Sequence, residues 1–254
     1  MKIFTLLTSI LVASCHHVYY APNTPNAPLL SQKGDTRINA LYSAGSDSDF
    51  EGGELQFAHA VSGKVRIMIN GFFGGVTENT GSRDEKGNGT YVELGAGRFA
   101  ALDEKRRWIG ELYGGLGFGS VKNDYGLGDH SQVNIFKPFI QPIVGYKSKY
   151  FELAIVPRLS LVTWMVKKNF IGSQENESAK NDLDYISGKP RFFAFEPAFL
   201  MRGGGEDVKL QASLSFSRFR STNVLYSPEL TETLNASIGI SVNFNATART
   251  VRKN

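Results

Sequence analysis

The chain has 254 residues, of which 27 are glycine and 12% are aromatic, while only 20% are charged. This composition favours a single all-β domain with many strands and tight turns. The formal net charge is only +4, and the basic residues are scattered singly, which excludes the basic stripe of a nucleic-acid-binding protein. No apolar stretch approaches the ~20 residues of a spanning helix, so this chain could cross a membrane only as a closed barrel.

The first residues have the pattern of a secretory signal peptide. Met1 and Lys2 form a short basic region, a mostly apolar stretch follows, and it ends on Val12-Ala13-Ser14-Cys15. The stretch is too short to span a membrane. Residues 12–15 resemble the lipobox of bacterial lipoproteins, which implies a signal peptide over 1–14 and a lipid on Cys15. The alternative is an ordinary signal peptide followed by an incidental cysteine.

Cys15 is the only cysteine, so an intramolecular disulfide is impossible. The next residue is His16 rather than aspartate, and by the same resemblance this is compatible with delivery to the outer membrane. No acidic residues stand directly behind the cysteine, which favours an anchor in the periplasmic leaflet.

Residues 15–35 are expected to form a lipid-anchored linker of extended character, because they contain three prolines and no alternation. Pro22 to Leu29 reads PNTPNAPL. It resembles the PNxxNxPL leader that follows the lipidated cysteine in uncharacterised outer-membrane β-barrel proteins of the Bacteroidetes type. The resemblance implies an outer-membrane barrel lipoprotein, with outer-membrane lipid as its partner.

Period-2 alternation of apolar and polar residues begins at Thr36 and predicts an all-β fold. In the last segment Ile238, Ile240 and Val242 share one face, and Ser237 and Ser241 share the other. We predict a single up-and-down antiparallel transmembrane β-barrel of about ten strands over 36–246, followed by a C-terminal tail over 247–254. The ten predicted strands are 36–43, 50–61, 64–76, 90–101, 107–120, 132–147, 150–166, 190–202, 207–219 and 232–245.

The connections between these segments alternate in length. Short turns are expected at 62–63, 102–106, 148–149 and 203–206, an intermediate loop at 44–49, and long polar loops at 77–89, 121–131, 167–189 and 220–231. Outer-membrane barrels have short periplasmic turns and long outer loops. Both termini are therefore predicted on the periplasmic side, together with the lipid anchor. The alternative is a soluble barrel or sandwich, whose apolar faces would point inward.

The prolines within strands and the aromatic residues near strand ends are both predicted to face outward. Pro138, Pro142, Pro157 and Pro197 interrupt three strands, so we expect bulges or a weakened wall there. Aromatic residues near strand ends are placed to form girdles at the two membrane interfaces. These are Tyr42, Phe73, Tyr91, Trp108, Tyr146, Tyr150, Trp164 and Phe244.

The polar faces place charges of both signs inside the barrel. They are Arg37, Glu54, Arg66, Glu93, Glu111, Lys137, Glu152, Arg158, Glu196 and Lys209. A ten-stranded barrel is narrow, so each buried charge needs a partner or water. These residues form either a polar pathway for small solutes or a salt-bridged plug, and we favour the plug.

Signals for chemistry are weak. Asp129-His130 is the single dipeptide that matches part of the omptin-type protease site, and a loop pair of this kind is usually solvated. The other histidines, His16, His17 and His59, make no metal constellation, and no Gly-x-Ser-x-Gly is present. The glycine runs at 95–97, 114–119 and 203–205 make room for neighbouring side chains rather than bind phosphate. We expect no enzyme, no metal and no cofactor.

The leading hypothesis is an outer-membrane barrel lipoprotein with a structural or surface-interaction role and at most slow passage of small solutes. The longest loop, 167–189, is its expected contact surface. A lipid-tethered periplasmic barrel that binds an apolar ligand is the alternative, and an enzyme based on Asp129-His130 is the third hypothesis.

Overall fold

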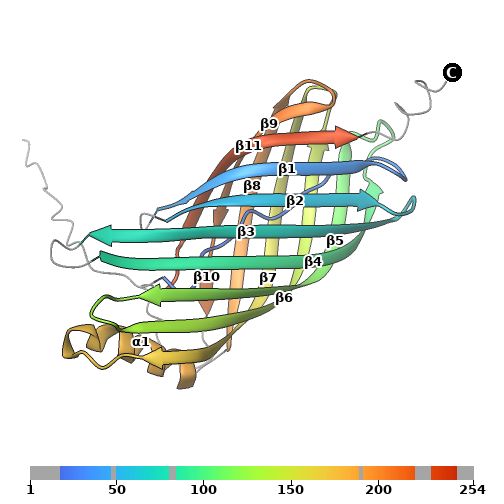
Figure 1. Ribbon diagram of the computed structural model, residues 1–254. Helices are drawn as coiled ribbons and strands as arrows, with labels where there is room; N and C mark the ends of the chain where they lie inside the picture. The colour runs from blue at the N-terminus through green and yellow to red at the C-terminus, as the bar shows by residue number, and fades with distance from the viewer. Residues whose placement is uncertain (1–17, 47–49, 80–83, 189–190, 221–229, 245–254) are drawn as a thin grey trace, which may run out of the picture.

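The computed structural model describes residues 18–46, 50–79, 84–188, 191–220 and 230–244, which form a closed antiparallel barrel (Figure 1). From β1 to β9 each strand pairs with the next, β9 pairs with β11, and β1 pairs with β11 to close the ring. The strands are β1 Thr36–Gly45, β2 Glu51–Ala60, β3 Val65–Asn79, β4 Asp84–Ala101, β5 Trp108–Asp124, β6 His130–Lys147, β7 Phe151–Phe170, β8 Arg191–Gly204, β9 Val208–Phe216, β10 Arg218–Arg220 and β11 Leu234–Phe244.

The ten predicted strands are confirmed. β9 and β10 are one strand interrupted at Ser217, and both pair with β8 in a single register, so the wall has ten positions. β3 to β7 run further toward the long loops than predicted, and β3 and β4 stay paired as far as Asn79 and Asp84. The alternation of apolar and polar residues stops before the strand pairing does, because a strand end with water on both faces needs no apolar face.

Apolar side chains point outward from every strand position, whereas the inward faces carry all the buried charged residues of the wall together with two clusters of buried apolar side chains. This is the reverse of a soluble barrel, where the apolar face would fill the interior. Many large apolar side chains on this outer surface are more than one third exposed, and Leu210 reaches 67%. One from each position is Ile38, Leu55, Ile67, Leu94, Leu112, Ile140, Ile155, Phe195, Leu210 and Ile238.

The girdle prediction is wrong for two residues. Tyr42, Phe73, Trp108, Tyr150 and Phe244 are exposed on the outside, whereas Tyr91 and Trp164 are buried inside the barrel. Each lies on the inward face of its strand, as do the charged or aliphatic residues two positions away. Trp164 packs against Phe192 and Phe219, with ring centroids at 4.8 and 5.8 Å. These inner rings belong to an aromatic core at the end that carries the long loops.

The four strand prolines face outward, as predicted, without shifting the register at their own positions. Pro157 lies directly opposite Pro197 in an unbroken β7–β8 register. Two opposed prolines can share only a non-hydrogen-bonded pair of an antiparallel ladder, so neither removes a bond there. The pairing of β6 with β7 is interrupted at Pro138 and Pro142, and the register shift in that ladder lies at Gln132 and Val133. The expected bulges at the prolines are therefore wrong, and the weakened wall is found between β6 and β7.

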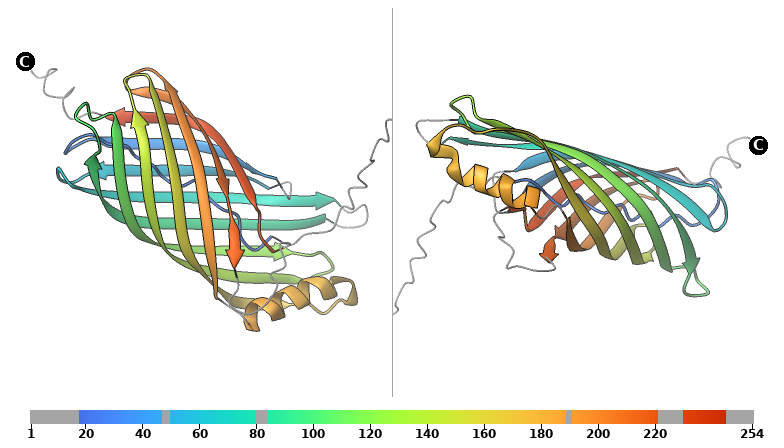
Figure 2. Two further views of the ribbon diagram at one scale, coloured as in Figure 1. Left: turned by 180° about the vertical axis from the view of Figure 1, so that it is seen from behind. Right: turned by 90° about the horizontal axis from the view of Figure 1, so that it is seen from below.

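A helix covers the long-loop end of the barrel, where the sequence analysis predicted an irregular loop over 167–189. β7 continues to Phe170, and a short 3-10 turn, η1 Gln174–Asn176, leads into α1 Glu177–Gly188. Figure 2 shows α1 lying across this end of the barrel. The buried Ala179, Leu183 and Ile186 share one face of α1 at helical spacing, and Leu183 and Ile186 join the aromatic core. Among the described residues, no helix has the length and apolarity to cross a membrane.

Inward glycines of β5 make room for large side chains of the neighbouring strands. A Cβ atom at Gly117 would collide with the hydroxyl of the buried Tyr91, while a Cβ at the outward Gly114 would meet nothing within 4 Å.

We therefore expect Gly117→Val to prevent native closure of the barrel and Gly114→Val to be tolerated. The measurement is the fraction of each variant that migrates as the compact species on an unboiled gel. Equal compact fractions for the two variants would show that Tyr91 simply moves aside.

Candidate functional site: a strap inside the barrel

Residues 18–35, here called the strap, run through the barrel from its long-loop end to its short-turn end (Figures 1 and 2). At the long-loop end the Tyr19 amide donates to the Leu230 carbonyl, and Tyr20 forms a parallel bridge with Thr231. At the short-turn end the Gly34 amide donates to the Ala60 carbonyl, just before β1 begins. Every residue from Pro22 to Leu30 is buried. The described part of the expected linker therefore lies in the lumen of the barrel.

The strap has no regular strand partner, so wall side chains satisfy its backbone. Its prolines lack an amide hydrogen, which reduces the number of donors that must be matched in the interior. Its carbonyl oxygens accept hydrogen bonds from long polar side chains of the wall. The acceptor and donor pairs are Pro22 with Asn235, Thr24 with Gln56, Asn26 with Gln141, Ala27 with Arg202, Leu29 with Lys147 and Leu30 with Arg66.

The side chains of the PNTPNAPL segment are hydrogen-bonded to the wall as well. Asn23 Nδ2 donates to Glu93 at 3.0 Å, and Asn26 Nδ2 donates to Asn70 at 2.9 Å. Thr24 donates through both its amide and its hydroxyl to the carboxylate of Glu54, at 3.1 and 2.9 Å. The polar residues of this segment thus hold the strap at fixed positions in the lumen.

Four buried charges at mid-height form a balanced group that we call the central cluster: Glu93, Lys137, Arg158 and Glu196. Glu93 lies 2.9 Å from Arg158 and 3.2 Å from Lys137, and Lys137 lies 3.5 Å from Glu196. The strap completes the cluster, because the Tyr20 hydroxyl donates to Glu196 and accepts from Lys137. Two acids and two bases in mutual contact leave no net charge in this part of the interior.

A second group lies towards the short-turn end. Glu152 contacts Arg37 at 2.6 Å, Arg202 at 3.0 Å and Lys209 at 3.6 Å. Arg66 pairs with Glu111 close by. Arg202 was not among the predicted inward charges, although it shares the inward face of β8 with Glu196 at even spacing. Arg202 directly precedes the glycine run that ends the strand, so the alternation along the strand did not single it out.

The structure places all ten predicted inward charges inside the barrel, each at most 5% exposed. Nine of them belong to the two groups just described or to the Arg66–Glu111 pair. The tenth is Glu54, whose carboxylate is held by Thr24 of the strap and by the Ser43 hydroxyl at 2.6 Å. Sequence reasoning missed the role of the strap, because its partners are spread over strands that are distant in sequence.

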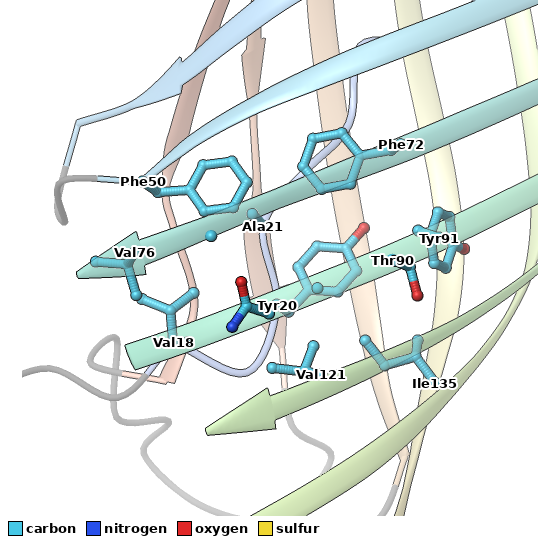
Figure 3. A pocket seen from close by; sticks show the side chains of 14 residues that line it. Val18, Tyr20, Ala21, Phe50, Phe72, Val76, Thr90, Tyr91, Val121 and Ile135 are labelled. Atoms are coloured by element: carbon cyan, nitrogen blue, oxygen red, sulfur yellow. The ribbon is translucent and has the colours of Figure 1, made fainter. Parts of the chain in front are cut away.

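Between the strap and the wall, at the long-loop end, lies a small pocket of about 50 Å³. Figure 3 shows the rings of Tyr20, Phe50 and Phe72 around it, with Val76 and Val121 closing its sides. Pockets that hold drug-sized ligands have volumes of roughly 300–1,000 Å³. This pocket has room for a few atoms only.

Asp129 and His130 are used separately in the structure. The Asp129 carboxylate accepts hydrogen bonds from the Gly172 amide at 3.0 Å, the Ser173 amide at 3.1 Å and Asn176 Nδ2 at 2.8 Å. These bonds lower the pKa of Asp129. The His130 ring instead stacks on Phe170, at 4.8 Å between centroids. Asp129 therefore attaches the segment before α1 to the barrel.

We expect this attachment to depend on pH through Asp129. Because its folded pKa is depressed, the stabilisation is complete above the ordinary aspartate value near ~3.9 and is lost as the pH falls through the folded pKa. Limited proteolysis of residues 171–188 should therefore be slow at pH 7 and faster near pH 3. Asp129→Ala should be cleaved readily at both pH values, whereas Asp103→Ala at the opposite end should behave like the unaltered chain. Equal cleavage of Asp129→Ala and the unaltered chain at pH 7 would contradict this role.

The other predicted histidines form no site. His59 Nδ1 lies 2.9 Å from the Thr36 hydroxyl near a short turn, while Cys15, His16 and His17 lie outside the described residues. In the part of the chain that the structure describes, no group of three or more His, Cys, Asp or Glu side chains could hold a metal ion.

Comparison with known proteins gives a weak likeness of fold. No protein-family model matches the chain, and no curated protein sequence matches it. Among solved structures, CdiB from Acinetobacter baumannii is similar over 84% of this chain, with 8% sequence identity and a TM-score of 0.23. The match covers 60% of the length of CdiB. A likeness at this level supports no conclusion about activity or partners.

Proposed function

We propose that the chain is an outer-membrane β-barrel lipoprotein, closed by its own strap, with a structural or surface-interaction role. The observation that carries the proposal is the apolar outer surface, which is present on all ten strand positions. Monomeric soluble proteins rarely expose contiguous apolar patches larger than a few hundred Å². A closed barrel with an apolar outer surface is the β arrangement that a bilayer requires.

Outward aromatic residues near both ends of the barrel support the same proposal. Trp108 and Tyr146 pack together near the short turns, at 5.4 Å between centroids, while Tyr42 and Phe73 are exposed nearer the long loops. Amphipathic rings prefer the level of the lipid headgroups. The two belts would therefore lie at the two interfaces.

The packed interior favours a plugged barrel rather than one with a pathway for solutes. The strap and the central cluster fill the cross-section with side chains that are almost completely buried. The alternative, a periplasmic barrel holding an apolar ligand inside, has little support, because the interior at mid-height is polar and the apolar pocket beside Tyr20 measures about 50 Å³. We also propose no catalytic role, since Asp129 and His130 bind other parts of the chain.

Membership in the Bacteroidetes-type barrel family remains a prediction. It is supported by the PNTPNAPL segment, whose Asn23, Thr24 and Asn26 are the residues that hold the strap to the wall.

The test uses a Cys15→Ala variant that carries an ordinary cleavable signal peptide. We expect the unlipidated protein to remain in the outer membrane after a carbonate wash and to change its gel mobility on boiling. The lipidated chain, treated in parallel, provides the control. Release of the variant by carbonate would contradict the proposal, because the barrel would then be held at the membrane only by its lipid.

A further inference from the structure

The strap has a fixed direction, which determines where the N-terminus leaves the barrel. Val18 lines the pocket formed by the long-loop ends of β3 and β4, and the Tyr19 hydroxyl lies 2.8 Å from that of Tyr125 in the β5–β6 turn. Ser31 and Gln32 instead line a hollow at the opposite end, beside Lys105 and Lys149 of the short turns. The chain therefore enters the lumen at the long-loop end and descends to β1.

Chain length then limits the position of Cys15. Three peptide units separate it from Val18, and an extended chain covers at most ~3.6 Å per residue, so the two Cα atoms lie within about 11 Å. The ten residues of β1 span roughly 33 Å at ~3.3 Å per residue, or about 25 Å along the axis of a barrel whose strands tilt by ~40°. Cys15 therefore cannot reach the short-turn end.

We propose that the N-terminus emerges on the cell surface and that the lipid on Cys15 lies in the outer leaflet of the outer membrane. This inference rests on the proposed function, since it assumes a spanning barrel whose long loops face outward. It replaces the expectation that the anchor lies in the periplasmic leaflet. That expectation rested on the ends of the strands, which do lie at the short turns, and on the lack of acidic residues behind Cys15, and it did not include the return of the chain through the lumen.

The strap is held too firmly to be drawn back through the barrel. Its backbone accepts hydrogen bonds from Asn235, Gln141 and Arg202, and Thr24 is bonded to the buried Glu54. Release of the strap would break all of these hydrogen bonds together and leave the lumen without the segment that fills it. The exit at the long-loop end is therefore part of the native fold.

A single introduced cysteine can report on which side of the outer membrane a segment lies, because Cys15 is the only native cysteine and has no free thiol when it is lipidated. Three variants are compared: His17→Cys next to the strap, Lys180→Cys on the exposed face of α1, and Lys105→Cys in a short turn. Each is treated with a membrane-impermeant biotin maleimide, first on intact cells and then on permeabilised cells. An epitope inserted between His16 and His17, detected by antibody on intact cells, gives a second measurement of the N-terminus.

The inference predicts labelling of His17→Cys and Lys180→Cys on intact cells, and of Lys105→Cys only after permeabilisation. Labelling of Lys180→Cys without His17→Cys or the epitope would overturn the proposed exit. Labelling of Lys105→Cys alone on intact cells would overturn it as well, because the barrel would then be inverted. If no position reacts on intact cells and carbonate releases the Cys15→Ala protein, the proposed function itself fails.

Discussion

Deletion of the strap should convert the closed barrel into one that conducts ions. Removing residues 19–30 while keeping Cys15 to Val18 joined to Ser31 empties the lumen of its largest occupant. The wall groups that now bind the strap, such as Arg202 and Glu54, would then be hydrated instead. We expect discrete conductance steps in planar bilayers for the deleted protein and none for the full chain.

The same deletion should lower stability, because it removes many buried hydrogen bonds, each contributing roughly 0.5–1.5 kcal/mol. Thr24→Val provides a matched control: it keeps the volume of the strap and removes the hydroxyl that contacts Glu54 and Ser237. This variant should unfold at lower temperature yet remain non-conducting. If the deleted protein migrates as a compact species and still does not conduct, the wall side chains alone close the lumen.

Removal of one charge from the central cluster should be among the most destabilising point substitutions. Glu93→Gln leaves Arg158 and Lys137 buried with Glu196 as their remaining carboxylate in the cluster. Breaking a buried ion pair in this way costs about 3–5 kcal/mol. The measurement is the urea concentration at the midpoint of unfolding, in detergent or lipid vesicles.

The double substitution Glu93→Gln with Lys137→Met tests whether charge balance is the cause. It leaves one acid and one base, Glu196 and Arg158, and should recover part of the stability that the single substitution loses. Equal losses for the single and double variants would indicate that hydrogen bonds to the strap, rather than balance of charge, stabilise the cluster.

The sequence predicted the wall well because alternation is a local signal. Ile238 and Ile240 point outward and Ser237 and Ser241 point inward, and the position of Arg158 among the inward charges followed from the same rule. The prolines also faced the predicted way. Their effect on the strand pairing could not be predicted from the sequence, because it depends on Pro157 being opposite Pro197 on another strand.

The interior was harder to predict, because its partners are remote in sequence. Asn23 and Glu93 are 70 residues apart, and Tyr20 and Glu196 are 176 apart. A segment with three prolines and no periodicity resembles a solvated linker until the cavity that receives it is known. The helix over 177–188 did carry a local signal, the helical spacing of Ala179, Leu183 and Ile186. The signal is weak, because three apolar residues stand among many polar ones.

The position of the strap also has a consequence for the order of assembly. The strap is synthesised before any strand of the wall, yet its contacts include Glu54 in β2, Arg158 in β7 and Asn235 in β11. A closed ring could receive it only by threading a polar chain through a narrow lumen. We therefore expect the ring to be completed around the strap, and under the proposed topology the N-terminus has already crossed the membrane when the ring closes.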